Sequence, residues 1–201
     1  MHRRLVVPAL ALAVTASLAA CGSDDSSSAD TTVAAVEATA GTTAGAVALN
    51  EADLEFTQGM IGHHEQAVEM AEIALDPTVG ASAAVVDLAT RIQAAQEPEI
   101  DLMTGWLTAA GESTVMDMSS DEMMAMEGMM SVEDMDGLAS STGAEFETMW
   151  LEMMIAHHEG AISQSETVKA DGSNSDVLAL ADQIIAAQQA EITEMQALLQ
   201  G

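Results

Sequence analysis

Two copies of one short motif hold the residues in this chain whose types and spacing are best suited to chemistry. Met60-Ile-Gly-His63-His64-Glu65 recurs as Met154-Ile-Ala-His157-His158-Glu159. The sequence has five histidines, and the fifth, His2, lies in a segment that we expect to be cleaved off. Imidazole is a ligand for copper, zinc and iron, and the methionine thioether is a soft ligand that suits copper(I). We therefore expect any chemistry beyond packing at these two motifs.

The motifs belong to an internal duplication. The segment 91–96 aligns with 183–188, and Glu99-Ile100 aligns with Glu191-Ile192. Each half predicts a helical hairpin, and two hairpins that bury each other's apolar stripes predict an all-α four-helix bundle. The expected helices run from Asn50 to about 75, 81 to 110, 144 to 170 and 176 to 199. Pro98 predicts a kink or break near Gln96 in the second helix.

Helical spacing places polar residues on the apolar faces. At about 100° per residue, His63 and His64 flank Met60 on the apolar face of the first helix. The third helix repeats this pattern around Met154. On the partner helices, the apolar stripes enclose two Gln-x-x-Glu pairs, which are Gln96 with Glu99 and Gln188 with Glu191. A carboxylate on a core face is costly unless it is paired or binds a metal.

The residues themselves leave three interpretations open. In the first, the interior binds a metal through His63, His64, His157 and His158, with Met60 and Met154 as soft ligands and Glu99, Glu191, Gln96 and Gln188 as supporting or alternative ligands. In the second, the same residues form a buried polar network without metal. The glutamates accept hydrogen bonds from the imidazoles, and the glutamines hydrogen-bond to the polar atoms that are still unpaired. In the third, Glu99 and Glu191 help to hold iron or manganese in a redox protein.

The residue three positions before each histidine pair bears on the choice of metal. Di-iron bundles place Glu-x-x-His on two of their helices. Here Met60 and Met154 stand where the glutamates would be. A thioether in place of a hard carboxylate favours copper over iron, and imidazole leaves zinc open.

The connection between the hairpins, residues 112–143, is rich in methionine and acids. Its closely spaced thioethers are auxiliary candidates for soft metals, namely Met116, Met118, Met123, Met124, Met126, Met129 and Met130. The alternative is that they are adaptable apolar residues of short helices that cover the bundle. Ser120 and Ser131 are each followed by acids, in the pattern of a helix start.

The N-terminal segment and the net charge of the chain indicate its cellular location and the partners that it disfavours. Residues 1–20 have a basic start and an apolar stretch, and Leu18-Ala-Ala-Cys21 follows, which predicts a lipoprotein signal peptide with Cys21 as the lipidated residue. An ordinary signal peptide or a helical anchor is the alternative. Residues 21–48 read as a disordered Ser/Thr/Ala tether, and 49–201 as the domain, with hairpins 49–111 and 144–201. The formal charge of −29 disfavours nucleic acid and anionic membrane as partners.

The chain resembles the bacterial extracytoplasmic proteins catalogued as domain of unknown function 305, which include CopM-like copper-binding proteins. The resemblance rests on both His-His-Glu motifs and on the segments 94–100, 143–146 and 184–192, and it covers about residues 50–200. It implies a ferritin-like helical bundle, and a copper-tolerance role for some members. The connection contains no histidine, unlike that of the most Met- and His-rich members.

These features together favour an extracytoplasmic, lipid-anchored protein on the bacterial membrane that binds or sequesters copper without turnover. No nucleophile–base arrangement is visible in the sequence, so an enzyme is the less favoured reading. The sequence does not specify a protein partner, the oligomeric state or the oxidation state of the metal.

Overall fold

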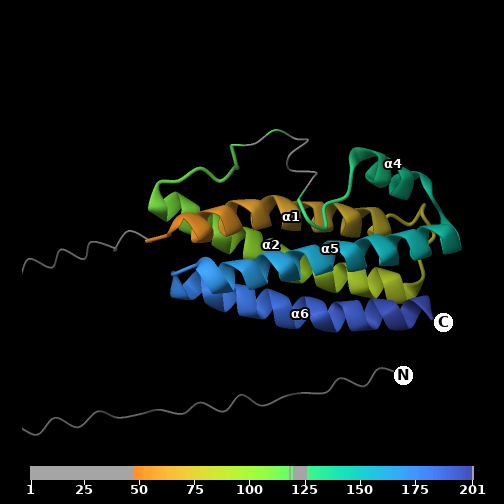
Figure 1. The fold of residues 1–201 in the computed structure, drawn as a ribbon. Coiled ribbons are helices and arrows are strands. Elements are labelled where there is room, and N and C mark those ends of the chain that lie inside the picture. The colour runs from red at the N-terminus through yellow and green to blue at the C-terminus, as the bar shows by residue number, and fades with distance from the viewer. Residues whose placement is uncertain (1–47, 118, 120–125, 201) are drawn as a thin grey trace, which may run out of the picture. The chain divides into compact units, whose positions relative to one another are not determined.

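The computed structural model describes residues 48–117, 119 and 126–200. In these residues the chain forms five helices and no strand: α1 (Glu51–Leu75), α2 (Ala83–Ala110), α4 (Val132–Ser140), α5 (Gly143–Asp171) and α6 (Ser175–Leu199). The regions expected as signal peptide (1–20) and, through residue 47, as tether lie outside the described residues. So do Cys21, Met118, Met123, Met124 and the helix start expected at Ser120. The four long helices form the predicted all-α bundle (Figure 1).

Local sequence signals set the helix ends. Asn50 and Asp53 form a reciprocal capping box at the start of α1, and Ser131 and Asp134 form another at the start of α4. At the end of α2, Gly111 adopts a left-handed conformation with φ 78°, which a residue without a Cβ adopts at little cost. The predicted boundaries of the long helices lie within about two residues of the observed ones.

The break expected near Gln96 does not occur. Helix α2 runs unbroken from Ala83 to Ala110 with Pro98 in its interior. A proline leaves the carbonyl four residues earlier without its helical donor, and that carbonyl belongs to Ala94, which is exposed. Water can therefore satisfy the carbonyl, so the cost of Pro98 is small enough for the helix to continue.

The two hairpins are joined by one long crossover. The connection after α2 runs back along the bundle through α4, so that α5 lies antiparallel to α1 (Figure 1). Hydrogen bonds confirm this pairing at both ends: the Gly143 amide donates to the Val79 carbonyl at 2.7 Å, and the Asn50 side chain donates to the Asp171 carbonyl at 2.9 Å. A single long crossover is the connectivity of ferritin-like bundles.

The bundle core consists of two hydrophobic clusters. One cluster includes Met70, Leu88, Trp150 and Met154, and the Trp150 indole N–H donates to the Met70 carbonyl at 2.8 Å. The other includes Phe56, Met60, Leu107 and Leu180. In all four long helices the segment between the two clusters is polar, and this segment contains the candidate site. No helix among the described residues is long and apolar enough to cross a membrane.

Candidate metal centre

A polar layer crosses the middle of the bundle. All four long helices contribute to it: His63 and His64 from α1, Gln96 and Glu99 from α2, His157 and His158 from α5, and Gln188 and Glu191 from α6. The four imidazoles are at most 1% exposed, and both glutamine side chains are 3% exposed. We call these eight residues the histidine layer. The sequence placed all eight on core faces, and the fold brings the two sets of the duplication to one level.

Each hairpin pairs one histidine with one glutamate. His64 Nε2 lies 2.7 Å from Glu99 Oε2, and His158 Nε2 lies 2.8 Å from Glu191 Oε2. The Glu99 and Glu191 side chains are 21% and 14% exposed, so each carboxylate reaches from the buried imidazole toward solvent. When the imidazole donates from Nε2, its Nδ1 carries a lone pair, which is the arrangement that carboxylates impose on metal-binding histidines.

The other two histidines meet between the hairpins. The ring centroids of His63 and His157 are 3.8 Å apart with the planes tilted by 40°. His63 Nε2 also lies 3.3 Å from the Glu127 carbonyl oxygen, which fixes Nε2 as its donor and leaves its Nδ1 as an acceptor. The layer therefore presents imidazole lone pairs from both halves of the duplication at the junction of α1 and α5.

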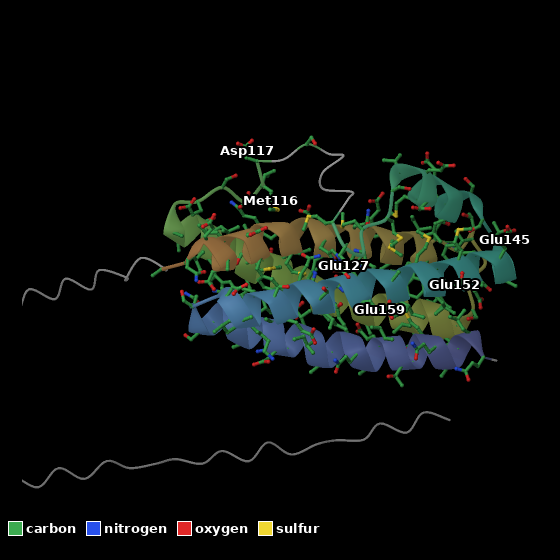
Figure 2. All side chains as sticks on the ribbon, in the orientation of Figure 1. Met116, Asp117, Glu127, Glu145, Glu152 and Glu159 are labelled. Atoms are coloured by element: carbon green, nitrogen blue, oxygen red, sulfur yellow. The ribbon has the colours of Figure 1, made fainter. Side chains whose placement is uncertain are left out.

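Residues 126–130, which we call the strap, close the α1–α5 side of the layer. Glu127 lies where α1 and α5 approach each other (Figure 2). Its carbonyl oxygen also accepts from the Gln164 side chain at 3.3 Å, and its carboxylate accepts from the Ser163 hydroxyl at 2.8 Å. Further along, the Gln66 amide makes two hydrogen bonds to the backbone of Met130, at 2.7 and 2.9 Å.

The strap fits because one position of the duplication differs between the halves. The residue after His64-Glu65 is Gln66, and the residue after His158-Glu159 is Gly160. A Cβ at Gly160 would collide with the Glu127 carbonyl and lie 2.6 Å from the Cα of Gly128, whose own φ is 85°. Glycine at 160 thus admits the strap backbone, and glutamine at 66 holds it by hydrogen bonds. The sequence did not identify this role, although the Gln-to-Gly difference between the repeats was its visible signal.

Many buried polar atoms of the layer have no partner among the described residues. They are Nδ1 of His63, His64 and His158, both ring nitrogens of His157, both amide atoms of Gln96 and Oε1 of Gln188. Buried polar atoms in native proteins are nearly always hydrogen-bonded or bound to an ion or water. Glu99 and Glu191 each accept a hydrogen bond from one imidazole. The two glutamines do not hydrogen-bond to the remaining ring nitrogens, so the residues of the layer do not satisfy all of their own buried polar atoms.

Burial keeps the central histidines neutral. Desolvation, together with the neighbouring charge of His64, lowers the pKa of His63 from 6.5 to about 3, although the Glu127 carbonyl acts in the opposite direction. Desolvation, followed by the charges of the surrounding histidines, also holds the pKa of His157 well below its ordinary value. A neutral imidazole is the form that binds metals, so both rings are available as ligands at neutral pH.

These pKa shifts predict that acid destabilises the metal-free protein. Between about pH 6.5 and pH 3 the unfolded chain binds a proton at His63 and the folded chain does not, so stability present above pH 6.5 is lost as the pH falls. At pH 5 the loss from His63 alone is about 2 kcal/mol, and His157 adds to it. Urea unfolding at pH 7.5 and pH 5 in a chelator measures this loss. A variant carrying His63→Gln and His157→Gln should lose less, and equal losses in both proteins would contradict the assignment.

The donor atoms of the layer fit a soft or borderline metal. The fully buried thioethers of Met60 and Met154 lie one helical turn before the histidine pairs, on the same helix faces. Among the described residues, no group of three or more His, Cys, Asp or Glu side chains is arranged to hold a metal ion. The same holds for the four histidines, so the choice of metal rests on the types of donor atom. The layer offers imidazole and thioether donors, which suit copper.

The described methionines of the connection occupy different environments. Met130 is 9% exposed and belongs to the first hydrophobic cluster. Met116, Met126 and Met129 are half-buried. Met116 and Met126 line a pocket next to the start of α1. The connection therefore both covers the bundle, as the packing interpretation expects, and keeps two thioethers beside an open pocket.

Comparison with known proteins gives the family. The model of DUF305, a domain of unknown function, matches residues 53–199. The chain belongs to the DUF305 family. This match confirms the family resemblance that the sequence motifs indicated. No curated protein matches this DUF305 chain significantly.

Solved structures share the fold of this DUF305 chain. A DUF305 fragment from Deinococcus radiodurans is 28% identical, with a TM-score of 0.68, over 75% of this chain and 97% of that one. A DUF305 protein from Streptomyces coelicolor, described as a candidate secreted protein, is 30% identical, with a TM-score of 0.65, over 74% and 91%. CopM in its Cu(I)-bound form is 28% identical, with a TM-score of 0.60, over 74% and 95%. CopM has also been solved with Cu(II) and with silver bound.

Proposed function

We propose that this protein binds copper in the histidine layer and sequesters it or passes it on. The observation that carries the proposal is the set of buried, unpartnered nitrogens on all four histidines. Three of the imidazoles direct Nε2 to an oxygen, at 3.3 Å for His63, 2.7 Å for His64 and 2.8 Å for His158, and so keep Nδ1 as a lone pair. A buried lone pair without a donor is stabilised when a metal ion binds it.

Each residue type in and beside the layer has its own role in this proposal. His63, His64, His157 and His158 are the main ligands, and Met60 and Met154 supply soft donors. Glu99 and Glu191 hold the His64 and His158 rings in place and reach solvent. Copper(I) and copper(II) would be bound by different subsets, because thioether favours the reduced ion. The CopM structures with copper and silver support this choice of metal.

The alternative with iron or manganese requires Glu99 and Glu191 as direct ligands. Both carboxylates instead accept hydrogen bonds from imidazoles. This engagement favours a supporting role for them and favours copper over a carboxylate-bridged redox centre.

The location we propose is the outer face of the bacterial cell membrane, with Cys21 as the lipid anchor. Support comes from the basic start, the apolar stretch and Leu18-Ala-Ala-Cys21. The Streptomyces coelicolor relative, described as a candidate secreted protein, is consistent with a role outside the cytoplasm. In this position the acidic surface would raise the local concentration of metal cations.

A metal titration tests the proposed function. We expect copper(I) to bind at about one or two ions per chain and to raise the melting temperature more than zinc or iron(II) does. Native mass spectrometry gives the stoichiometry, and thermal unfolding gives the stabilisation, which is about 2.7 kcal/mol when free metal is 100 times Kd. If none of these ions binds stoichiometrically or changes the melting temperature, the layer is a structural network. Preference for iron(II) would support the carboxylate alternative.

A further inference from the structure

A pocket outside the histidine layer brings together two methionines from the connection. It has a volume of about 240 Å³ and lies between the start of α1 and the end of α5. Its lining includes Glu55, Phe56, Met116, Met126, Gln164 and Asp171. Figure 2 shows Met116 in the connection, beside α1. The pocket thus combines two thioethers with two carboxylates, although its residues come from three separate parts of the chain.

The two thioethers converge on one point of α1. A Cβ added to Gly59 would lie 2.9 Å from Met126 Cε and 3.4 Å from Met116 Sδ. The same Cβ would lie 3.8 Å from Gln164 Oε1. Because Gly59 has no side chain, the ends of the Met116 and Met126 side chains can both pack against this point of α1. Gly59 directly precedes Met60 and lies one helical turn before His63.

Packing alone does not account for these two methionines. Neither Met116 nor Met126 belongs to the two hydrophobic clusters, and both are half-buried at an open pocket. Met130, by contrast, is part of the first cluster. A methionine that only fills a gap in the core is not expected to line, together with a second methionine, an open pocket that also contains carboxylates.

The chemistry of the pocket selects a soft cation. Thioether sulfurs are poor ligands for Ca²⁺ or Mg²⁺ and good ligands for copper(I) and for the similarly soft silver(I). Glu55 and Asp171 add negative charge at the pocket, which attracts cations and repels anions. Gln164 lies against the same point and also donates to the Glu127 carbonyl, so the pocket is joined to the strap over His63.

We propose that Met116 and Met126 form an outer site for a soft monovalent cation, copper(I) or silver(I), at Gly59. Binding at this site does not require the histidine layer. Its use as an entry point, from which copper passes to Met60 and His63, rests on the function proposed above. The site deepens that function by giving the buried layer an exchangeable position near solvent.

Silver(I) is the probe for the test because it does not change oxidation state. The protein is labelled with ¹³C at the methionine methyl groups, and Met116 and Met126 are assigned from single Met→Leu variants. We expect their methyl resonances to shift on addition of silver(I). The double variant Met116→Leu/Met126→Leu should bind about one silver ion per chain fewer than the wild type. The matched control, Met135→Leu/Met149→Leu, changes two half-buried methionines that pack on the first cluster and should bind as the wild type does.

A variant with all four buried histidines replaced by glutamine separates the two sites. The methyl shifts of Met116 and Met126 should persist in it, even though the layer has lost its ligands. The outer site is refuted if the Met116/Met126 variant keeps the silver stoichiometry of the control. It is also refuted if the shifts disappear in the four-histidine variant, because the two sites would then be one. Failure of the histidine layer shows differently, as copper(I) affinity that stays at the wild-type value when the four histidine changes are combined with Met116→Leu/Met126→Leu.

Discussion

Replacing His63, His64, His157 and His158 with glutamine is expected to raise the copper(I) dissociation constant by at least about 100-fold. Removing a residue that only orients a ligand costs about 10- to 100-fold in metal affinity, and this change removes the ligands themselves. Glutamine keeps a polar, hydrogen-bonding side chain in a layer that is at most 1% exposed at these positions. Competition with a chromophoric copper(I) chelator measures the affinity, and circular dichroism verifies that the variant is folded.

The matched control replaces Glu72 and Glu166, which occupy equivalent exposed positions of the duplication, with glutamine. It should bind copper as the wild type does, because it changes surface charge and leaves the layer intact. An intermediate case is Glu99→Gln with Glu191→Gln, for which we expect a loss of about 10- to 100-fold because a neutral amide oxygen replaces the carboxylate that accepts from each of the His64 and His158 rings. Unchanged affinity in the four-histidine variant would place the copper elsewhere in the chain.

Asp53→Ala is expected to destabilise the fold by about 3 kcal/mol or more. The Asp53 side chain is fully buried and accepts from the backbone amides of Asn50, Ser173 and Asn174. It therefore ties the start of α1 to the loop between α5 and α6, and its removal leaves several partly buried backbone donors without this acceptor. For a domain of this size the melting temperature should fall by roughly 6 to 12 °C.

Glu51→Ala is the control for Asp53, since Glu51 is an exposed acid in the same first turn of α1. It should change the free energy of unfolding by no more than about 0.5 kcal/mol. Chemical denaturation measures both. Folded Asp53→Ala protein should keep its copper affinity, because Asp53 lies at the end of the bundle and not in the layer. A loss below about 1 kcal/mol would contradict the account of Asp53 as a tie between the hairpins.

Periodic patterns made the bundle and most of its polar layer predictable. The spacing of Met60, His63 and His64 could only place the imidazoles on the apolar face, because helical geometry is local and regular. The capping residues Asn50 and Gly111 set helix ends for the same reason. The break predicted at Pro98 was wrong, since sequence alone does not show that Ala94, whose carbonyl is left without a donor, is exposed.

Contacts that depend on the path of the connection were not predictable. Asp53 belongs to the local capping box of α1, but its bonds to Ser173 and Asn174 join residues about 120 positions apart. The fit of the strap against Gly160 likewise depends on where the connection crosses α1 and α5. Helical periodicity does not encode such crossings, because an irregular segment has no repeating face. The convergence of Met116 and Met126 at Gly59 arises in the same way, from the path of a long connection.

The most direct test of the copper-binding layer is ¹⁵N NMR of the histidine rings with and without copper(I), which is diamagnetic. In the metal-free protein we predict that His64 and His158 carry their proton on Nε2, facing Glu99 and Glu191. One equivalent of copper(I) should then shift Nδ1 resonances of the layer strongly, while Nε2 of His64 and His158 stays protonated. Copper(I) that binds stoichiometrically while every ring nitrogen keeps its metal-free resonance would contradict the account.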